Sequence, residues 1–356
     1  LITRKIERIY PKTYKFLDFY EGLLLALDTL KKRGLRIQLH TYSTEAKEER
    51  MREILRKGEL KQMNLIIGPV YGDCLEIASK WAKKNKIYLI SPLESPQDIL
   101  INNPYVLKAK PSENTHFEKI SSYLARQTEK NIVIVDEDSF VDSLERTRLK
   151  NKLLKILLSQ NRLVEVHVIN EVIIDELQEN ELKPSISPEM ENLVFINSRD
   201  EAFVSGVLSQ LNYLSIENDI TVLGYPVWQW YKNIDINYYF NLHYTFISPF
   251  YTDYENPRVK QFLKKFRRFY HTEPSPFSYS FLGYDIGYYF IDAYSKYASA
   301  FPQCLSIYHP ELIYSRFDFY QINTQSGFEN MAGCLYQYSK NMSIQKSKPI
   351  NIFSNQ

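Results

Sequence analysis

Glycine and cysteine are scarce in this chain of 356 residues, which contains 11 Gly and 3 Cys. Three cysteines cannot all pair, and Cys74, Cys304 and Cys334 form neither a CxxC motif nor a Cys/His metal spacing. A disulfide framework is therefore excluded, although one bridge is compatible with the sequence. The glycines match neither GxGxxG nor GxxxxGKS/T, which argues against nucleotide and dinucleotide enzymes.

An excess of one charge and long apolar runs are also missing. The 44 Lys and Arg residues against 42 Asp and Glu leave a net charge of +2, so no global field predicts nucleic acid or an anionic membrane as a partner. No apolar run reaches the roughly 20 residues that cross a bilayer. The opening residues 1–15 lack the apolar core of a signal peptide, and we expect a trimmed or processed start.

Catalytic constellations are absent as well, because there is no GxSxG elbow and the six His residues show no HExxH or similar spacing. The most enzyme-like string is VIVDED, in which Asp136 and Asp138 follow a buried strand, as metal ligands of glycosyl or phosphoryl transferases do. The favoured alternative is that Asp138 or Ser139 caps the next helix. We therefore predict no catalytic residue, no metal and no cofactor, and keep a metal-dependent transferase as a minor hypothesis.

Aromatic residues, in contrast, are abundant, with 28 Tyr and 20 Phe. Such a surplus suits a cleft for ring compounds or sugars, a protein interface, or simple packing of the core. The composition alone does not choose among these three.

The length and the alternation of patterns predict two α/β units in tandem. The first series is predicted as helices over 16–30, 44–57 and 72–85 with strands over 35–42, 64–69 and 87–92. The second is predicted as helices over 113–128, 141–160 and 200–214, a short helix after 169, and strands over 131–136, 163–169, 192–198 and 220–226. Alternating helices and apolar strands are typical of parallel sheets covered by helices.

The remaining chain does not add a simple third domain. Residues 243–253 are predicted to form a connecting strand, followed by two helices on either side of TEPSP, and the tail from about 313 is rich in strand patterns.

Seven segments carry a family resemblance when taken in order: DFYEGLLLALDTLKKRG, NLIIGPVYG, IYLISPLES, YVLKAKPS, NIVIVDED, ITVLGYP and FLKKFRRFYHTEPSPFSYSFLGYDIGYYFIDAY. Together they resemble the type I periplasmic binding proteins, and most closely the branched-chain amino-acid receptors of ABC transporters. The resemblance covers nearly the whole chain from Phe16. One departure is that the family has an apolar strand before its first helix, for which residues 1–15 offer no good candidate.

The resemblance implies an α/β fold with two doubly wound lobes joined by three crossover segments, which close on a ligand by a hinge. By analogy, lobe 1 comprises residues 1–110 and 249–315, and lobe 2 comprises residues 111–248 and 316–356. The crossings then fall near 110–112, 248–251 and 315–318.

The same resemblance implies a ligand site in the turns that follow the strands. The expected ligand-binding residues are Tyr71, Gly72, Asp73, Ser91, Pro92, Leu93, Glu94, Ser95, Asp138, Ser139, Ser198, Tyr225 and Trp228. Of these, Tyr71, Ser91, Tyr225 and Trp228 are candidates for ring stacking and hydrogen bonds.

The match is incomplete in the groups that hold an amino acid. The amino-acid receptors carry a hydroxyl residue where Gly72 stands and a Thr where Ser95 stands, and Glu94 adds a charge that would repel a ligand carboxylate by on the order of 1 kcal/mol. Pro226 stands near the place of a frequent acidic partner for the ligand ammonium. Asp136, Glu137 or Asp138 could replace this acidic partner, but nothing in the sequence places any of them near the ligand. A plain zwitterionic amino acid is therefore a doubtful ligand.

We predict an extracytoplasmic solute-binding protein, not an enzyme, that captures a small polar or amino-acid-like ligand for an ABC permease. The alternative is a degenerate binding-protein fold that acts as an interaction or sensory module of the cell envelope without small-molecule transport. In either case the expected location is periplasmic or otherwise extracytoplasmic, free or lipid-anchored through a leader that this chain does not contain.

Overall fold

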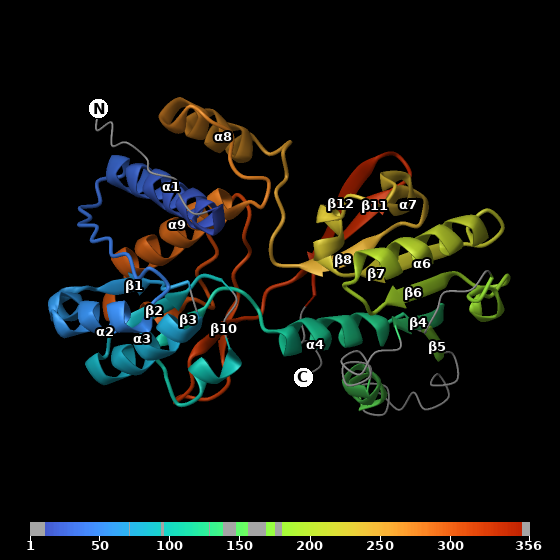
Figure 1. The fold of residues 1–356 in the computed structure, drawn as a ribbon, viewed down its shortest axis with the longest axis horizontal. Coiled ribbons are helices and arrows are strands. Elements are labelled where there is room, and N and C mark those ends of the chain that lie inside the picture. Colours follow the sequence, from blue (N-terminus) through green and yellow to red (C-terminus); the bar gives the residue numbers. More distant parts are fainter. Residues whose placement is uncertain are drawn as a thin grey trace. The chain divides into compact units, whose positions relative to one another are not determined.

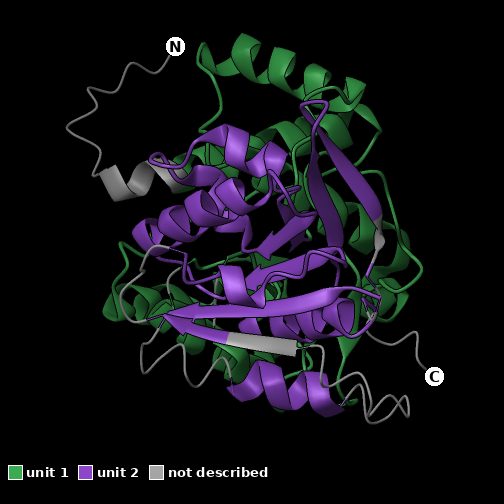
Figure 2. Cartoon of the chain, turned by 90° about the vertical axis from the view of Figure 1, so that its right-hand side faces the viewer, with its two compact units in different colours: residues 1–112, 249–331 green, residues 113–248, 332–356 purple. Residues whose placement is uncertain are grey.

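The computed structural model describes residues 11–70, 72–93, 96–127, 129–137, 147–155, 169–174 and 180–350. The chain forms two compact units, each built from two stretches of sequence (Figure 2). Unit 1 comprises residues 1–112 and 249–331, and unit 2 comprises residues 113–248 and 332–356. The predicted α/β class, with parallel strands and covering helices, is confirmed in both units (Figure 1).

Unit 1 is built on a five-stranded sheet. The strands lie in the order β1 (Leu65–Ile67), β2 (Tyr88–Ser91), β3 (Val106–Lys108), β10 (Phe328–Asn330) and β9 (Phe319–Gln321). The pairs from β1 to β10 are parallel, and β9 runs antiparallel to β10. The apolar side chains of β2 and β3 are almost fully buried, as expected for parallel strands covered on both faces.

The scarce glycines are used where two helices of unit 1 cross. Helix α1 (Pro11–Lys32) packs along α9 (Tyr279–Tyr297), and a Cβ on Gly22 or Gly283 would lie within 1.9 Å of a backbone oxygen of the other helix. The carboxylate of Asp18 fixes the same crossing by accepting a hydrogen bond from the backbone N–H of Ser280 at 2.7 Å.

The other helices of unit 1 agree with the helical spacing of the sequence. The helices predicted over 44–57 and 72–85 are observed as α2 (Glu48–Arg56) and α3 (Gly72–Asn85), and the helix predicted before TEPSP is α8 (Pro257–Tyr270). Shorter elements were not predicted: α10 (Phe301–Cys304) and the 3-10 turns η1 (Glu59–Gln62), η2 (Gln97–Leu100) and η6 (Ala298–Ala300). No helix in the described ranges is long and apolar enough to cross a bilayer.

The strand predicted over 35–42 is wrong, since these residues have no strand assignment. Strand β1 is the edge of the described sheet, so the segment has no ladder partner there. Its apolar alternation serves packing instead: Leu35 and Ile37 lie against the cluster formed by Leu30 and Tyr288. The alternation of apolar residues in this segment therefore reflects packing against helices rather than pairing in a sheet.

Unit 2 is built on a seven-stranded sheet. The strands lie in the order β12 (Ser343–Pro349), β11 (Cys334–Ser339), β8 (Thr245–Ser248), β7 (Ile220–Gly224), β6 (Asn192–Ile196), β4 (Asn131–Glu137) and β5 (Ile169–Ile174). The pairs from β8 to β5 are parallel, whereas β11 is antiparallel to both β8 and β12.

The helical elements of unit 2 are α4 (Glu113–Leu124), α6 (Glu201–Leu214) and α7 (Ile236–Asn241), with turns η4 (Lys183–Ser185) and η5 (Pro226–Trp230). Residues 147–155 are also helical, within the helix predicted over 141–160. Of the region after 169 in which a short helix is predicted, residues 169–174 form β5 and pair with β4, residues 175–179 lie outside the described residues, and residues 180–191 contain the 3-10 turn η4. The strand predicted over 163–169 lies almost wholly outside the described residues.

The chain returns from α9 to unit 2 later than the sequence indicated. The resemblance placed the third crossing near 315–318, but residues 316–331 belong to unit 1, where Phe328 of β10 is paired with Leu107 of β3. The first stretch also extends to Ser112, whose backbone N–H donates to the Glu329 carboxylate at 2.6 Å. The three cysteines are all free, so the bridge that the sequence left open is not formed.

A buried carboxylate organises the segment that follows α10. Asp285 of α9 is fully buried and accepts hydrogen bonds from the backbone N–H groups of Ile313, Tyr314 and Ser315 at 3.0, 2.9 and 2.6 Å. The same segment pairs with the chain leaving β8, through a bridge between Phe250 and Ser315. Asp285 thus holds one of two neighbouring extended segments of unit 1.

Candidate functional site

In open parallel sheets, ligands bind at the carboxyl ends of the strands, so the loops at these ends define the candidate site of each unit. In unit 1, the residues that directly follow β1 and β3 are each bonded to the end of β2 by a backbone hydrogen bond. The N–H of Gly68 donates to the carbonyl of Ile90, and the N–H of Ala109 donates to the carbonyl of Ser91, both at 2.9 Å. The ends of β1, β2 and β3 are therefore held side by side.

Five of the predicted ligand-binding residues in these loops are described, and they divide into two groups. Ser91 and Pro92 are buried, and Leu93 packs against the core of unit 1. Gly72 and Asp73, in contrast, are exposed at the first turn of α3. The predicted residues Tyr71, Glu94 and Ser95 lie outside the described residues.

The space at Gly72 bears on the hydroxyl that the resemblance expects there. A Cβ built on Gly72 meets no heavy atom within 4 Å, so a larger side chain fits without displacing a neighbour. The position also opens a 14-residue helix, whose first backbone N–H groups and positive dipole end favour an anion. The missing side chain leaves this helix end open to solvent or to a ligand.

In unit 2, a buried hydrogen-bond chain joins the ends of three strands. The hydroxyl of Tyr225, just after β7, donates to Asn197 Oδ1 at 2.5 Å, and Asn197 Nδ2, just after β6, donates to Asp136 Oδ1 on β4 at 2.7 Å. All three side chains are at most 2 % exposed. The chain fixes the relative positions of these strand ends in a way that the sequence did not foresee.

This arrangement also bears on the metal hypothesis. Asp136 is fully buried and engaged with Asn197, while Asp138, its proposed partner as a metal ligand, and Ser139, the alternative helix cap, lie outside the described residues. Within the described ranges, no three or more His, Cys, Asp and Glu side chains are grouped so that they could hold a metal ion. Because Asp138 is not among the described residues, the hypothesis of a metal held by Asp136 and Asp138 stays a prediction.

Ser198 connects the strand ends to the loop after β7. Its hydroxyl donates to the Glu137 carboxylate at 3.3 Å, and its carbonyl accepts from the indole N–H of Trp228 at 3.1 Å. The Trp228 ring is fully buried, stacked on Tyr244 at 5.2 Å, and a Cβ on Gly224 would lie 2.1 Å from it. The predicted stacking of a ligand on Trp228 does not fit this burial, and the ring instead positions Ser198.

Three polar residues near Tyr225 were missed at the sequence level. The guanidinium of Arg199 lies 4.0 Å from the centroid of the Tyr225 ring, and the His116 ring stacks on Tyr225 at 5.5 Å. Arg199 also forms an ion pair with Glu113 in the first turn of α4. The Tyr225 ring is thus covered, whereas the side chains of Arg199 and Glu113 remain 38 % and 62 % exposed.

Only Arg199 had a sequence signal, because it directly follows Ser198 at the end of β6. Glu113 and His116 come from a helix far away in sequence. The backbone of Arg199 is held by Tyr231, whose hydroxyl donates to the Arg199 carbonyl at 2.5 Å. Burial, followed by the nearby charges of Glu201 and Asp200, raises the pKa of Tyr231 to about 12, so this hydroxyl stays protonated at neutral pH.

Among the described groups that reach the surface at this edge are the Arg199 guanidinium and the carboxylates of Glu113, the half-buried Glu137 and Asp200, which caps α6. No described nucleophile here is paired with a base and an orienting third group, as covalent catalysis requires. Charges of both signs on a rigid strand-end frame suit recognition of a small polar molecule.

Comparison with known proteins finds similarity in the fold of the chain but not in its sequence. No protein-family model matches the chain, and no curated protein matches its sequence. Solved structures do match over most of their length. A substrate-binding protein of an ABC transporter from Desulfitobacterium hafniense, in complex with Leu, has a TM-score of 0.55 and 18% identity, with 92% of this chain and 95% of that chain covered.

Two further structures extend this match. A periplasmic ligand-binding protein of a branched-chain amino acid ABC transporter from Burkholderia xenovorans has a TM-score of 0.62 and 12% identity, covering 94% of this chain and 90% of that one. A solute-binding protein from R. palustris, in complex with benzoate, has a TM-score of 0.50 and 13% identity, covering 94% and 93%. The chain therefore has the type I periplasmic-binding-protein fold, the fold of the substrate-binding proteins of branched-chain amino acid ABC transporters.

Proposed function

We propose that this chain is a non-catalytic, extracytoplasmic solute-binding protein that serves an ABC transporter. In this proposal, a small polar, amino-acid-like ligand contacts strand-end loops of both units, and closure of the units about a hinge creates the form that the permease reads. The observation that carries the proposal is the set formed by the exposed Arg199 and Glu113 and the half-buried Glu137 at the strand ends of unit 2, in a chain with this fold.

We further propose that Arg199 binds a carboxylate of the ligand. Its planar guanidinium offers paired donors, and its partner Glu113 is 62 % exposed, so the ion pair contributes little and can be exchanged for a ligand. Leu and benzoate, which two of the matched structures contain, share a carboxylate and differ in the amine. Glu137, held by Ser198, is the counter-charge for a ligand ammonium where one is present.

The test is a thermal-shift screen over amino acids, small peptides, amides, sugars and aromatic acids, followed by calorimetric titration of the ligands that stabilise the protein. A ligand that binds only the folded state at 100 times its Kd adds about 2.7 kcal/mol of stability, which raises the melting temperature by several degrees.

Variants locate the binding. Arg199→Gln should weaken a carboxylate ligand at least about tenfold, because a hydrogen bond to a charged group contributes about 1.5–3 kcal/mol. The matched control is Arg36→Gln, which removes the same charge from an exposed residue of unit 1. Unchanged affinity in Arg199→Gln would remove Arg199 from the site, and loss of affinity in both variants would show only a general effect of charge.

The alternative, an envelope interaction module without a small ligand, is favoured by one observation: Ser91, Tyr225 and Trp228, three of the expected ligand contacts, are at most 2 % exposed. A screen in which no compound stabilises the protein would favour this alternative over transport.

A further inference from the structure

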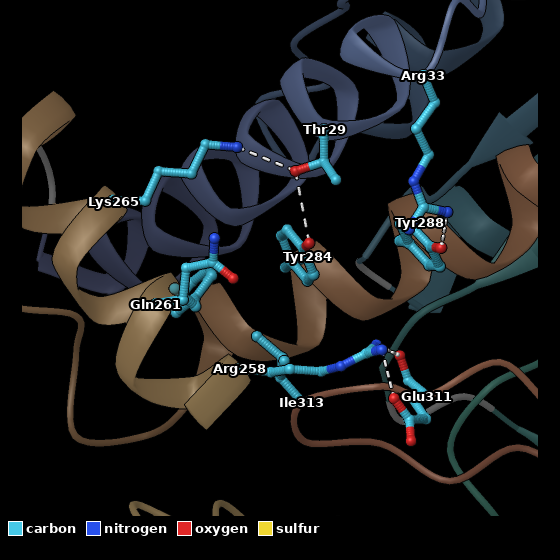
Figure 3. A pocket seen from close by; sticks show the side chains of 10 residues that line it. Thr29, Arg33, Arg258, Gln261, Lys265, Tyr284, Tyr288, Glu311 and Ile313 are labelled. Carbon is cyan, nitrogen blue, oxygen red and sulfur yellow. Dashed lines mark hydrogen bonds and ion pairs between the residues drawn. The ribbon is translucent and has the colours of Figure 1, made fainter. Parts of the chain in front are cut away.

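Unit 1 contains a cavity that is separate from the strand-end loops. It has a volume of about 280 Å³ and lies among α1, α8, α9 and the segment 311–313 (Figure 3). Along these helices it lies next to Thr29 near the end of α1, Gln261 on α8 and Tyr284 on α9. None of its lining residues belongs to a loop that follows a strand of the sheet. Its volume lies just below the range of typical ligand pockets, about 300–1,000 Å³, so a ligand here has to be small.

One wall of the cavity is apolar and aromatic. The rings of Tyr284 and Tyr288, one helical turn apart on α9, are stacked with centroids 6.2 Å apart and an interplanar angle of 10°. Phe262 and Ile313 complete this wall. A flat ring or a short aliphatic body has a matching surface here.

The other walls carry positive charge. The Arg33 guanidinium donates to the Tyr288 hydroxyl and lies 5.0 Å from the centroid of that ring, and it has no carboxylate partner among the described residues. In Figure 3, Arg33 comes from the end of α1 and reaches the Tyr288 hydroxyl, whereas Arg258 comes from α8 and extends to Glu311. Arg258 pairs with Glu311, but the two side chains are 51 % and 75 % exposed, so the pair is weak and can open.

The third cation of the cavity is already engaged. Lys265 Nζ contacts Asp28 at 2.8 Å, Thr29 Oγ1 at 2.9 Å and the carbonyl of Leu25 at 3.1 Å. The ammonium has three donors, and these contacts use all of them. The charge available to a ligand therefore comes from Arg33 and Arg258, opposed by Glu311 alone among the described lining residues.

We propose that this cavity is a second ligand site, which binds a small molecule with an oxyanion, carboxylate or phosphate, on a flat apolar body. The oxyanion is held by Arg33 and, after exchange of Glu311, by Arg258, because a guanidinium binds both headgroups through paired hydrogen bonds. The body lies against Tyr284, Tyr288 and Phe262. The site is independent of the function proposed for the strand-end loops.

The test uses the full chain and calorimetric titration with phenyl phosphate and benzoate, with phenol as the uncharged ring. We expect at least one of the two anions to bind the wild type at least tenfold more tightly than phenol does. The same anion should bind Arg33→Gln at least tenfold more weakly than it binds the wild type. The anion that binds identifies the headgroup. Added salt should weaken the binding, since the site is partly exposed.

Two control variants distinguish binding in this cavity from binding elsewhere on the chain. Arg36→Gln removes an exposed charge outside the cavity and should bind the anion as the wild type does. In Arg199→Gln, only binding at the strand-end loops of unit 2 should be lost, and the binding that Arg33→Gln weakens should persist. Arg258→Gln is the second cavity variant if Arg33→Gln lowers the melting temperature.

The proposal is overturned if neither anion binds, if phenol binds equally well, or if both cavity variants retain wild-type affinity. It is also overturned if Arg199→Gln alone abolishes binding, because the anion then occupies the strand-end loops. Conversely, loss in Arg33→Gln with no effect of Arg199→Gln supports the second site even if the transport proposal fails.

Discussion

The crossing of α1 and α9 makes a sharp prediction about stability. Replacing Gly283 by Ala places a Cβ 1.9 Å from the carbonyl oxygen of Phe19, whereas ordinary contacts begin at 3.4 Å. The helices must separate by about 1.5 Å or distort locally, because the obstacle is backbone rather than the flexible end of a side chain. Overpacking of this kind costs about 1–3 kcal/mol and occasionally more.

The helix propensity of the new residue opposes this cost. Ala is favoured over Gly by about 1 kcal/mol in a helix interior, so we expect a net loss of about 2 kcal/mol for Gly283→Ala if the packing cost is at the upper end of its range. Gly72→Ala is the matched control, since its Cβ meets nothing within 4 Å at the start of α3. This control should change stability by less than about 0.5 kcal/mol or increase it slightly.

The assay is urea unfolding of both variants, monitored by circular dichroism, with the midpoint and the slope fitted separately. A lower midpoint at constant slope for Gly283→Ala, with an unchanged midpoint for Gly72→Ala, is the expected result. If Gly283→Ala unfolds at the wild-type midpoint, the close approach of the two helices is not what the structure indicates. If the control falls equally, the loss does not come from the crossing.

Further predictions concern pH, packing and the strand-end frame. Burial raises the folded-state pKa of Asp285 from 3.8 to about 6. The free energy of unfolding of the wild type should therefore fall relative to that of Asp285→Asn as the pH rises from 3.8 to about 6, by up to about 3 kcal/mol in total. Parallel pH profiles of the two proteins would contradict this. Trp228→Ala should cost about 3–5 kcal/mol in chemical unfolding, because the ring is fully buried, and a loss below about 1 kcal/mol would show that the loop collapses. Tyr225→Phe should cost about 1–3 kcal/mol by leaving the Asn197 amide oxygen without its donor, and a neutral effect would mean that another group replaces it.

Local patterns in the sequence were sufficient to predict an element where its pattern does not depend on its neighbours. The helix predicted over 72–85 is observed as Gly72–Asn85, and the buried strand predicted over 131–136 is observed as Asn131–Glu137. Helical spacing and continuous apolar runs arise from the backbone period of each element, so they can be read without knowing its neighbours. The two-lobed fold, in contrast, was indicated by the resemblance of seven segments, taken in order, to a known family.

Pairing, in contrast, was decided by distant parts of the chain. Residues 35–42 have the alternation of a strand but no partner beyond β1, and their apolar side chains pack on helices. The assignment of β10 to unit 1 depends on its ladder with β3, more than two hundred residues earlier. Hydrogen bonds between strands need a partner at the right place, and no local pattern specifies that partner.

The candidate sites show the same division. The sequence by itself determined that strand-end turns follow β1, β2, β4, β6 and β7, and it placed Gly72 and Ser198 in them. Only the tertiary structure decided that Trp228 is enclosed, that Arg199 covers Tyr225, and that Arg33 faces a cavity between helices. The physical reason is that periodicity determines local backbone structure, whereas the exposure and charge environment of a side chain depend on every element packed around it.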